Sequence, residues 1–326
     1  MEITKELLIK DDLIESLIHE QTVKLRWEIE DVNYSEDQAS FRTLPEKAKI
    51  LTIYYLIFTL IGDDIVMDET EDSIINEAPE KHVSFLRYKQ ANEQTHARTY
   101  REMLLALLSV DQILDYAKNI VDSKPMKRKI VWLNENLRKC QTYADKNIVL
   151  SIAEGIFFRS VFLHFDWLNT SGLHNPLPGC VHGNKFIRDD ENFHQTALIK
   201  LAYQAGNITL TNVVDILADA VDVEIEVTKY IFEEILHVDS YSVSENTSVT
   251  GVEITRNYIR TLGNQWLRHF SRITHRQIDQ KLDADTLPAY CHGVTCRTNN
   301  FYEKDASSYH STLRRVKVEI LNPEDW

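Results

Sequence analysis

Two short stretches decide the fold and chemistry that the sequence predicts: Glu93-Gln94-Thr95-His96 and Glu191-Asn192-Phe193-His194. In each, a Glu and a His stand three positions apart, which places both side chains on one face of an α-helix. A carboxylate that could join them precedes each stretch, Asp63 in the first case and Glu154 in the second. The repeated pattern predicts two helices that present Glu and His side chains to metal ions.

Two such helices, with one carboxylate from each of two further helices, form the dinuclear site of ferritin-like bundles. Four carboxylates balance the charge of two divalent ions, so the buried cluster would be near neutral. Oxygen ligands with imidazole and no thiolate suit iron or manganese. We therefore predict an all-α, ferritin-like helical bundle with a dinuclear metal site in its core. The predicted ligands are Asp63, Glu93, His96, Glu154, Glu191 and His194.

A third Glu-x-x-His, from Glu234 to His237, competes with this interpretation, and Tyr241 follows its His by four residues. Chance alone would supply such a pair in a chain with 12 His. The segment runs into a Ser- and Thr-rich loop at Asp239, so we interpret it as a solvated helix end. On spacing alone, a buried ion network or helix-surface charge remains an alternative to metal binding.

The composition favours long helices, because only 9 Gly and 7 Pro occur in 326 residues and turn-rich folds need more of both. We predict a single helical domain over 1–313 and a flexible tail over 314–326. Residues 169–184 and 239–250 are predicted loops. Helices are predicted over 10–32, 79–108, 110–121, 127–169, 186–205, 210–237 and 252–282, with one more opening at Leu44-Pro45.

Charge and cysteine content exclude several function classes. A net charge of −14 repels phosphate backbones, which argues against nucleic-acid binding. The four Cys form no CxxC pair, so we expect free thiols in a reducing cytoplasm. The apolar run 50–61 is too short to cross a bilayer, and the charged N-terminus does not suggest a signal peptide. We expect no membrane association.

Four segments together resemble the ribonucleotide reductase small-subunit family. Residues 93–100, ending at Tyr100, resemble its Glu-x-x-His-x-x-x-Tyr segment. Residues 153–158 resemble its Glu-Gly-x-Phe-Phe motif, and residues 187–194 its Arg-Asp-Glu-x-x-His segment. Residues 62–66 resemble the segment that supplies the first Asp ligand. Trp27 also stands 36 residues before Asp63 (63 − 27 = 36), as expected for the family's electron-relay Trp.

The resemblance implies a mechanism and a role for individual residues. Two iron ions, oxo-bridged when oxidised, or manganese instead, would react with O2 and oxidise Tyr100 to a radical. The radical would pass to a large catalytic subunit that reduces ribonucleotides to deoxyribonucleotides, and this subunit would form a homodimer. The implied residues are Phe158, Phe162 and Ile187 around the radical, Trp27, Asp190 and Tyr309 in radical transfer, and Trp326 in docking of the tail on the large subunit.

The sequence also departs from the family and leaves alternatives open. Asp189 stands at the usual Arg position, with Arg188 one place upstream, and the loop lengths before Glu93 and Glu191 differ slightly. A related dimetal oxidase or monooxygenase would share the ligands without needing Tyr100 or the transfer residues. An iron-storing or purely structural helical protein is the second alternative. Taken singly, each aromatic residue named above would be ordinary core.

Overall fold

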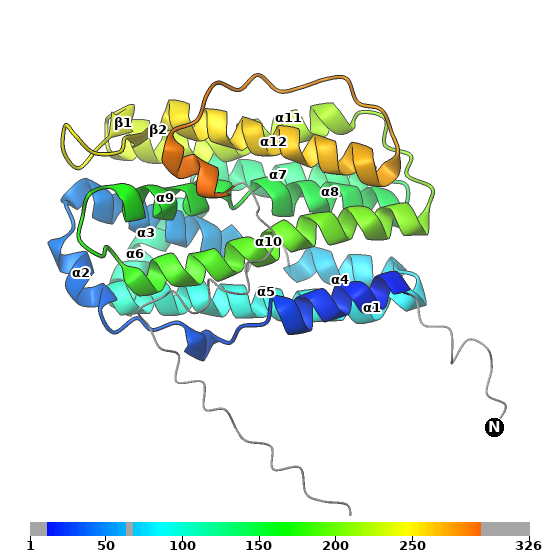
Figure 1. The fold of residues 1–326 in the computed structure, drawn as a ribbon, viewed down its shortest axis with the longest axis horizontal. Coiled ribbons are helices and arrows are strands. Elements are labelled where there is room, and N and C mark those ends of the chain that lie inside the picture. Colours follow the sequence, from blue (N-terminus) through cyan, green and yellow to red (C-terminus); the bar gives the residue numbers. More distant parts are fainter. Residues whose placement is uncertain (1–11, 63–67, 295–326) are drawn as a thin grey trace, which may run out of the picture. The chain divides into compact units, whose positions relative to one another are not determined.

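The computed structural model describes residues 12–62 and 68–294, and this part is almost entirely helical (Figure 1). The prediction of an all-α fold is confirmed. The predicted site residues Asp63, Tyr309 and Trp326, and the tail 314–326, lie outside the described residues. The helices are α1 (Asp12–His19), α2 (Asp37–Thr43), α3 (Glu46–Ile61), α4 (Asp68–Glu77), α5 (Glu80–Leu107), α6 (Val110–Val121), α7 (Lys124–Lys139), α8 (Tyr143–Ile156), α9 (Arg159–Thr170), α10 (Pro178–Ala205), α11 (Val213–Lys229) and α12 (Val252–Thr274).

Helices α3, α5, α8 and α10 form the centre of the bundle. Helix α10 packs along α8 and also contacts α5, α9 and α12, while α3 packs on α5 and α9. Helices α11 and α12 lie along one side of this centre, and α4 and α1 lie beside α5 on the other (Figure 1). Helix α3 is buried on nearly all sides from Leu51 to Ile61, which agrees with its almost uniformly apolar sequence.

The stretch predicted as one helix over 127–169 is three helices in the structure, and that prediction is wrong. Helix α7 ends before Cys140, whose backbone is extended. Helix α8 then starts behind Thr142, whose hydroxyl accepts a hydrogen bond from the Asp145 amide at 3.0 Å. A further break at Phe157-Phe158 separates α8 from α9. Apolar periodicity runs through all three helices and hides these local caps.

The predicted loop 169–184 is too long, because α10 already begins at Pro178. Proline suits the first turn of a helix, but no side chain beside it caps the helix. The cap comes from α2: the buried Asp37 carboxylate accepts hydrogen bonds from the amides of Gly179 and Cys180, both at 2.9 Å. A capping residue that lies so far away in the chain leaves no local signal in the sequence.

Four other predicted segments also differ from the structure. The predicted helix 10–32 ends at His19 and continues as a π-helical turn, Glu20–Lys24, before an irregular segment. Helix α11 ends at Lys229 and is followed by a second π-helical turn, Tyr230–Ile235. The predicted loop 239–250 holds strand β1 (Ser240–Tyr241), which pairs antiparallel with β2 (Thr250–Gly251). Helix α12 stops at Thr274, well before residue 282.

One described stretch, Tyr143–Thr170, is long and apolar enough to cross a membrane by length and composition. It is not a single helix, because it comprises α8 and α9. Its most apolar window is completely buried inside the protein. The stretch is therefore as deeply buried as the core helices of a globular protein.

We predict that Asp37→Ala destabilises the fold through α10. The substitution leaves two buried amide groups without their acceptor, which should lower the free energy of unfolding by about 2 kcal/mol. Urea denaturation followed by circular dichroism measures this. Asp115→Ala is the control, since Asp115 lies exposed on α6 and pairs only with Lys118. Equal stability of the two variants would contradict the capping role.

Candidate metal centre

A compact cluster of acidic and imidazole groups lies in the middle of the bundle. Potential ligand atoms of Glu93, Glu154, Glu191 and His194 all lie within 4.8 Å of one another. The cluster is inaccessible to solvent, since the most exposed member, Glu93, is 9% exposed. Glu93 comes from α5, Glu154 from α8, and the other two from α10.

His96 joins the same cluster from α5. Its Nδ1 lies 2.8 Å from Glu93 Oε2 and 2.9 Å from Glu191 Oε1. On the other side, His194 Nδ1 lies 2.8 Å from Glu93 Oε1. The structure thus brings together five of the six predicted ligands.

A glycine allows α8 and α10 to approach closely enough for this. A Cβ atom at Gly155 would lie 2.6 Å from Gln195 Oε1 and 3.1 Å from Trp266 Cδ1. A larger residue next to Glu154 would require the Gln195 side chain to shift, so Gly155 eases the approach of α8 to α10. Glu154 and Glu191 meet between these two helices.

The pKa values show how strongly these groups interact. Burial and the neighbouring carboxylates raise the pKa of Glu154 well above its ordinary value. Burial also opposes ionisation of Glu191, but the adjacent imidazoles of His194 and His96 lower its pKa to about 2. Burial opposes protonation of His96, but the charge of Glu93 together with the neighbouring carboxylates of Asp190 and Glu191 raises the pKa of that imidazole well above its usual value. The cluster is an acidic site that requires positive charge.

Hydrogen bonds behind the two imidazoles fix their orientation. His96 Nε2 donates to Asp190 Oδ2 at 3.0 Å, and His194 Nε2 donates to Gln21 Oε1 at 2.9 Å. In both rings, Nδ1 is therefore the atom that faces the carboxylates. A histidine that binds metal through one nitrogen normally donates from the other to such a group.

The two supporting groups are themselves connected. Gln21 Nε2 donates to Asn92 Oδ1 at 2.8 Å, and Asn92 Nδ2 donates to Asp190 Oδ2 at 3.2 Å. A continuous hydrogen-bonded chain, here called the outer chain, thus runs from His194 through Gln21, Asn92 and Asp190 to His96. Sequence reasoning missed Gln21 and Asn92. Asn92 could have been found by its position directly before Glu93, whereas Gln21 lies in a different segment and carries no such signal.

The donor set fits a dinuclear metal centre. Among the residues that the structure describes, five buried atoms of the cluster lack a partner with hydrogen-bond geometry: Glu154 Oε1 and Oε2, Glu191 Oε2, His96 Nδ1 and His194 Nδ1. Buried polar atoms are almost always satisfied, and cations that bind oxygen and imidazole would satisfy these.

A lysine that sequence reasoning also missed contacts the cluster directly. Lys89 Nζ lies 2.7 Å from Glu93 Oε1 and 2.6 Å from Glu154 Oε1. The residue is 1% exposed and stands one helical turn before Glu93 on α5. Its spacing from Glu93 was visible in the sequence, but such pairs are common on exposed helix faces.

Trp27 lies against the His96 side of the site. Its indole Nε1 donates to Asp190 Oδ2 at 2.7 Å. The indole stacks on the His96 ring with an interplanar angle of 8° and on Phe186 with one of 15°. The three predicted partners Trp27, Asp190 and His96 are thus in direct contact.

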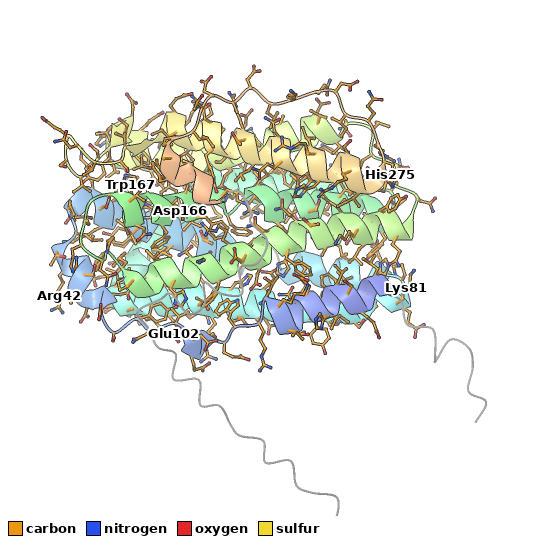
Figure 2. The ribbon with its side chains drawn as sticks, viewed as in Figure 1. Arg42, Lys81, Glu102, Asp166, Trp167 and His275 are labelled. Carbon is orange, nitrogen blue, oxygen red and sulfur yellow. The ribbon has the colours of Figure 1, made fainter. Side chains whose placement is uncertain are left out.

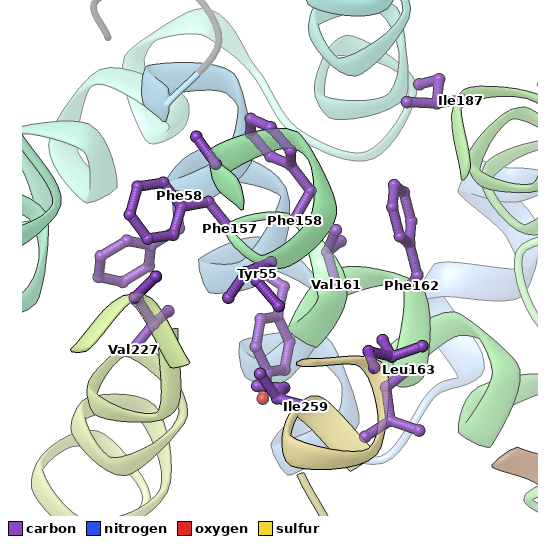
Figure 3. Close-up of a cluster of buried hydrophobic side chains, with 14 of the residues drawn as sticks. Tyr55, Phe58, Phe157, Phe158, Val161, Phe162, Leu163, Ile187, Val227 and Ile259 are labelled. Atoms are coloured by element: carbon purple, nitrogen blue, oxygen red, sulfur yellow. The ribbon is translucent and has the colours of Figure 1, made fainter. Parts of the chain in front are cut away.

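Tyr100 is completely buried on α5, one helical turn beyond His96. Phe158, Phe162 and Ile187 are also buried, the first two at and after the α8–α9 break and the third on α10 (Figure 3). Phe158 lies beside Gly62, the last described residue before Asp63, because a Cβ at Gly62 would be 3.5 Å from its ring. Their role around a radical remains a prediction.

The structure gives Arg188 a partner. Its Nη1 lies 2.9 Å from both carboxylate oxygens of Asp166, which links α10 to α9. Asp166 is labelled on α9 in Figure 2. Asp189, at the usual Arg position, is exposed. In the competing motif, Glu234 and His237 are both exposed, which agrees with a solvated helix end.

Residues 8–270 match the family model described as ribonucleotide reductase, small chain. The chain is 27% identical over 212 residues to the ribonucleoside-diphosphate reductase small chain of Acanthamoeba polyphaga mimivirus. That alignment covers 64% of this chain and about half, 51%, of the viral protein. This chain belongs to the ribonucleotide reductase small-chain family.

Solved structures share its fold. The crystal structure of Streptococcus sanguinis dimanganese(II)-NrdF has a TM-score of 0.72 at 17% identity and covers 90% of this chain and 99% of that one. The Rnr4 homodimer from Saccharomyces cerevisiae has a TM-score of 0.70 at 18% identity, with coverage of 95% and 89%. The similarity extends over nearly the whole ferritin-like bundle.

We predict that Gln21→Leu weakens metal binding although Gln21 is not a ligand. The change removes the acceptor of His194 Nε2, so affinity for Mn²⁺ should fall by about 10- to 100-fold. Equilibrium dialysis measures it. The matched control is Gln204→Leu, because Gln204 Oε1 contacts another buried histidine, His82, at 2.7 Å. Unchanged Mn²⁺ affinity in Gln21→Leu would rule out the orienting role.

Proposed function

We propose that this chain is the radical-generating small subunit of a ribonucleoside-diphosphate reductase. The observation that carries the proposal is the contact of Trp27 and His96 with one oxygen of Asp190, which links a buried indole to the carboxylate cluster. A related dimetal oxidase or monooxygenase would need the ligands but not this link. Membership of the small-chain family supports the same choice.

The cluster is proposed to hold two iron ions, or manganese in their place, with Asp63 as the sixth ligand. The donor set suits either metal, and the dimanganese form of the Streptococcus sanguinis protein supports manganese as an option. When bound, the reduced metal pair and an oxidant derived from O2 supply the potential needed to oxidise a phenol. The residues of the chain then determine where the oxidation occurs and how long its product lasts.

Tyr100 is the proposed site of the radical. It loses one electron and its phenolic proton when it is oxidised. Its complete burial excludes water and external reductants, and the buried side chains of Phe158, Phe162 and Ile187 are the proposed walls of its pocket. These apolar groups offer no easily oxidised atom to the radical.

Asp190 is the proposed link in radical transfer. A single carboxylate oxygen, Oδ2, accepts hydrogen bonds from Trp27 Nε1 and His96 Nε2. The carboxylate holds both rings in their stacked arrangement and can accept the indole proton when Trp27 gives up an electron. Tyr309 is proposed to continue the path to the partner.

The proposed partner is the large catalytic subunit, on which the tail 314–326 would dock through Trp326 after a single domain over 1–313. We further propose a cytoplasmic homodimer. The Rnr4 protein of Saccharomyces cerevisiae, which shares the fold, forms a homodimer, and this supports the assembly.

We predict that Tyr100→Phe abolishes the radical without preventing metal binding. After ferrous iron and O2 are added to metal-free protein, electron paramagnetic resonance should detect an organic radical in wild type and none in the variant. Manganese with an activating flavoprotein is the second loading condition. Tyr258→Phe, which changes another buried tyrosine, is the control and should keep the signal. A full radical signal in Tyr100→Phe would exclude this assignment.

We predict a different result for Trp27→Phe. The variant should still form the radical, because Trp27 is not one of the proposed metal ligands, but it should lose turnover with the large subunit. Reduction of a ribonucleoside diphosphate by the two-subunit complex is the measurement. Trp132→Phe removes a similarly buried indole on α7 and should leave turnover intact. Normal turnover in Trp27→Phe would show that electrons take another path.

A further inference from the structure

The Lys89 ammonium lies on one half of the metal centre rather than at its middle. The Glu93 oxygen that it contacts, Oε1, is also the one 2.8 Å from His194 Nδ1. The other oxygen, Oε2, faces His96. The second contact, Glu154, belongs to the compact group with His194. Lys89 therefore contacts the His194 half of the cluster, and His96 defines the other half.

The surroundings of Lys89 keep its charge directed at the carboxylates. A small cavity lies beside it between α4, α5, α8 and α10. Apolar groups cannot compensate an ammonium, so its charge stays with Glu93, which accepts its hydrogen bond, and with Glu154, with which it forms an ion pair. The other residues that line the cavity are all apolar: Ile74, Ile75, Leu86, Leu150 and Leu198.

The added charge changes the electrostatic balance of the centre. The four carboxylates carry −4 and the Lys89 ammonium +1, which leaves −3. One divalent ion brings this to −1, and a second brings it to +1. Without the lysine, the same two ions would give −2 and then zero. With the lysine, the second ion leaves a net positive charge buried in the centre, and repulsion by the ammonium is strongest for an ion in the half that it contacts.

We propose that Lys89 makes the two metal positions unequal. The ion on the His96 side binds first and tightly, and the ion held by Glu154 and His194 binds second and more weakly. This inference rests on the proposed dinuclear centre and adds a determinant of its loading order. Lys89 acts through the carboxylates that it contacts, as a positioning residue and not as a ligand.

Titration of the metal-free protein with Mn²⁺ tests the proposal without any activity measurement. Electron paramagnetic resonance separates isolated Mn²⁺ from spin-coupled pairs, and equilibrium dialysis gives both affinities. In wild type, the first equivalent should give isolated Mn²⁺, and the second should bind at least about 10-fold more weakly. Coupled pairs should appear only with the second equivalent.

Lys89→Gln should bring the two affinities together, so that coupled pairs form below one equivalent. Lys89→Arg keeps the charge and should keep the unequal loading. The matched control is Lys129→Gln, since Lys129 is also buried and pairs with Glu224 at 2.5 Å outside the cluster. Lys129→Gln should lower stability, measured by thermal unfolding, but leave the order of loading as in wild type.

Wild-type protein that binds both ions with equal affinity would overturn the proposal, even if no variant folds. Unequal affinities that persist in folded Lys89→Gln would overturn it as well. In both cases the dinuclear centre itself would stand. Failure of wild type and Lys89→Gln to bind any Mn²⁺ or Fe²⁺ would instead remove the proposed metal function, and this inference with it.

Discussion

The constraint on which the structure depends is the burial of several carboxylates in a helical core. Glu93, Glu154 and Glu191 are almost inaccessible to water, and such groups are costly to bury unless cations or donors surround them. Several groups of the bundle together meet this requirement. Lys89 and two imidazoles contact the carboxylates, Gly155 allows the helices to approach, and the outer chain holds the imidazoles.

The sequence was sufficient to predict the helical class and five candidate ligands that the structure brings together. The reason is that Glu and His three positions apart lie on one face of a helix, and two such helices imply a common site. It was not sufficient to predict that Gln21 and Lys89 contact the cluster. Gln21 reaches His194 across 173 positions, and Lys89 has the spacing of an ordinary surface ion pair until its burial is known.

Helix boundaries show the same division between local and distant causes. The start of α8 at Thr142 has a local cap and was hidden only by the apolar pattern around it. The start of α10 depends on Asp37, which lies in another helix, and no local reading of residues 169–184 could have located it. The break at Phe157-Phe158 contains no glycine or proline, and the sequence offered no signal for it.

The outer chain has a consequence for how the centre becomes competent. It joins the two histidines through the segment just after α1, so ring orientation on both sides depends on a part of the chain that supplies no ligand. His96 is held by Asp190 on α10, whereas His194 is held by Gln21, which lies outside the helices that carry the cluster. The geometry of both rings thus depends on residues 20–27, through Gln21 on the His194 side and Trp27 on the His96 side.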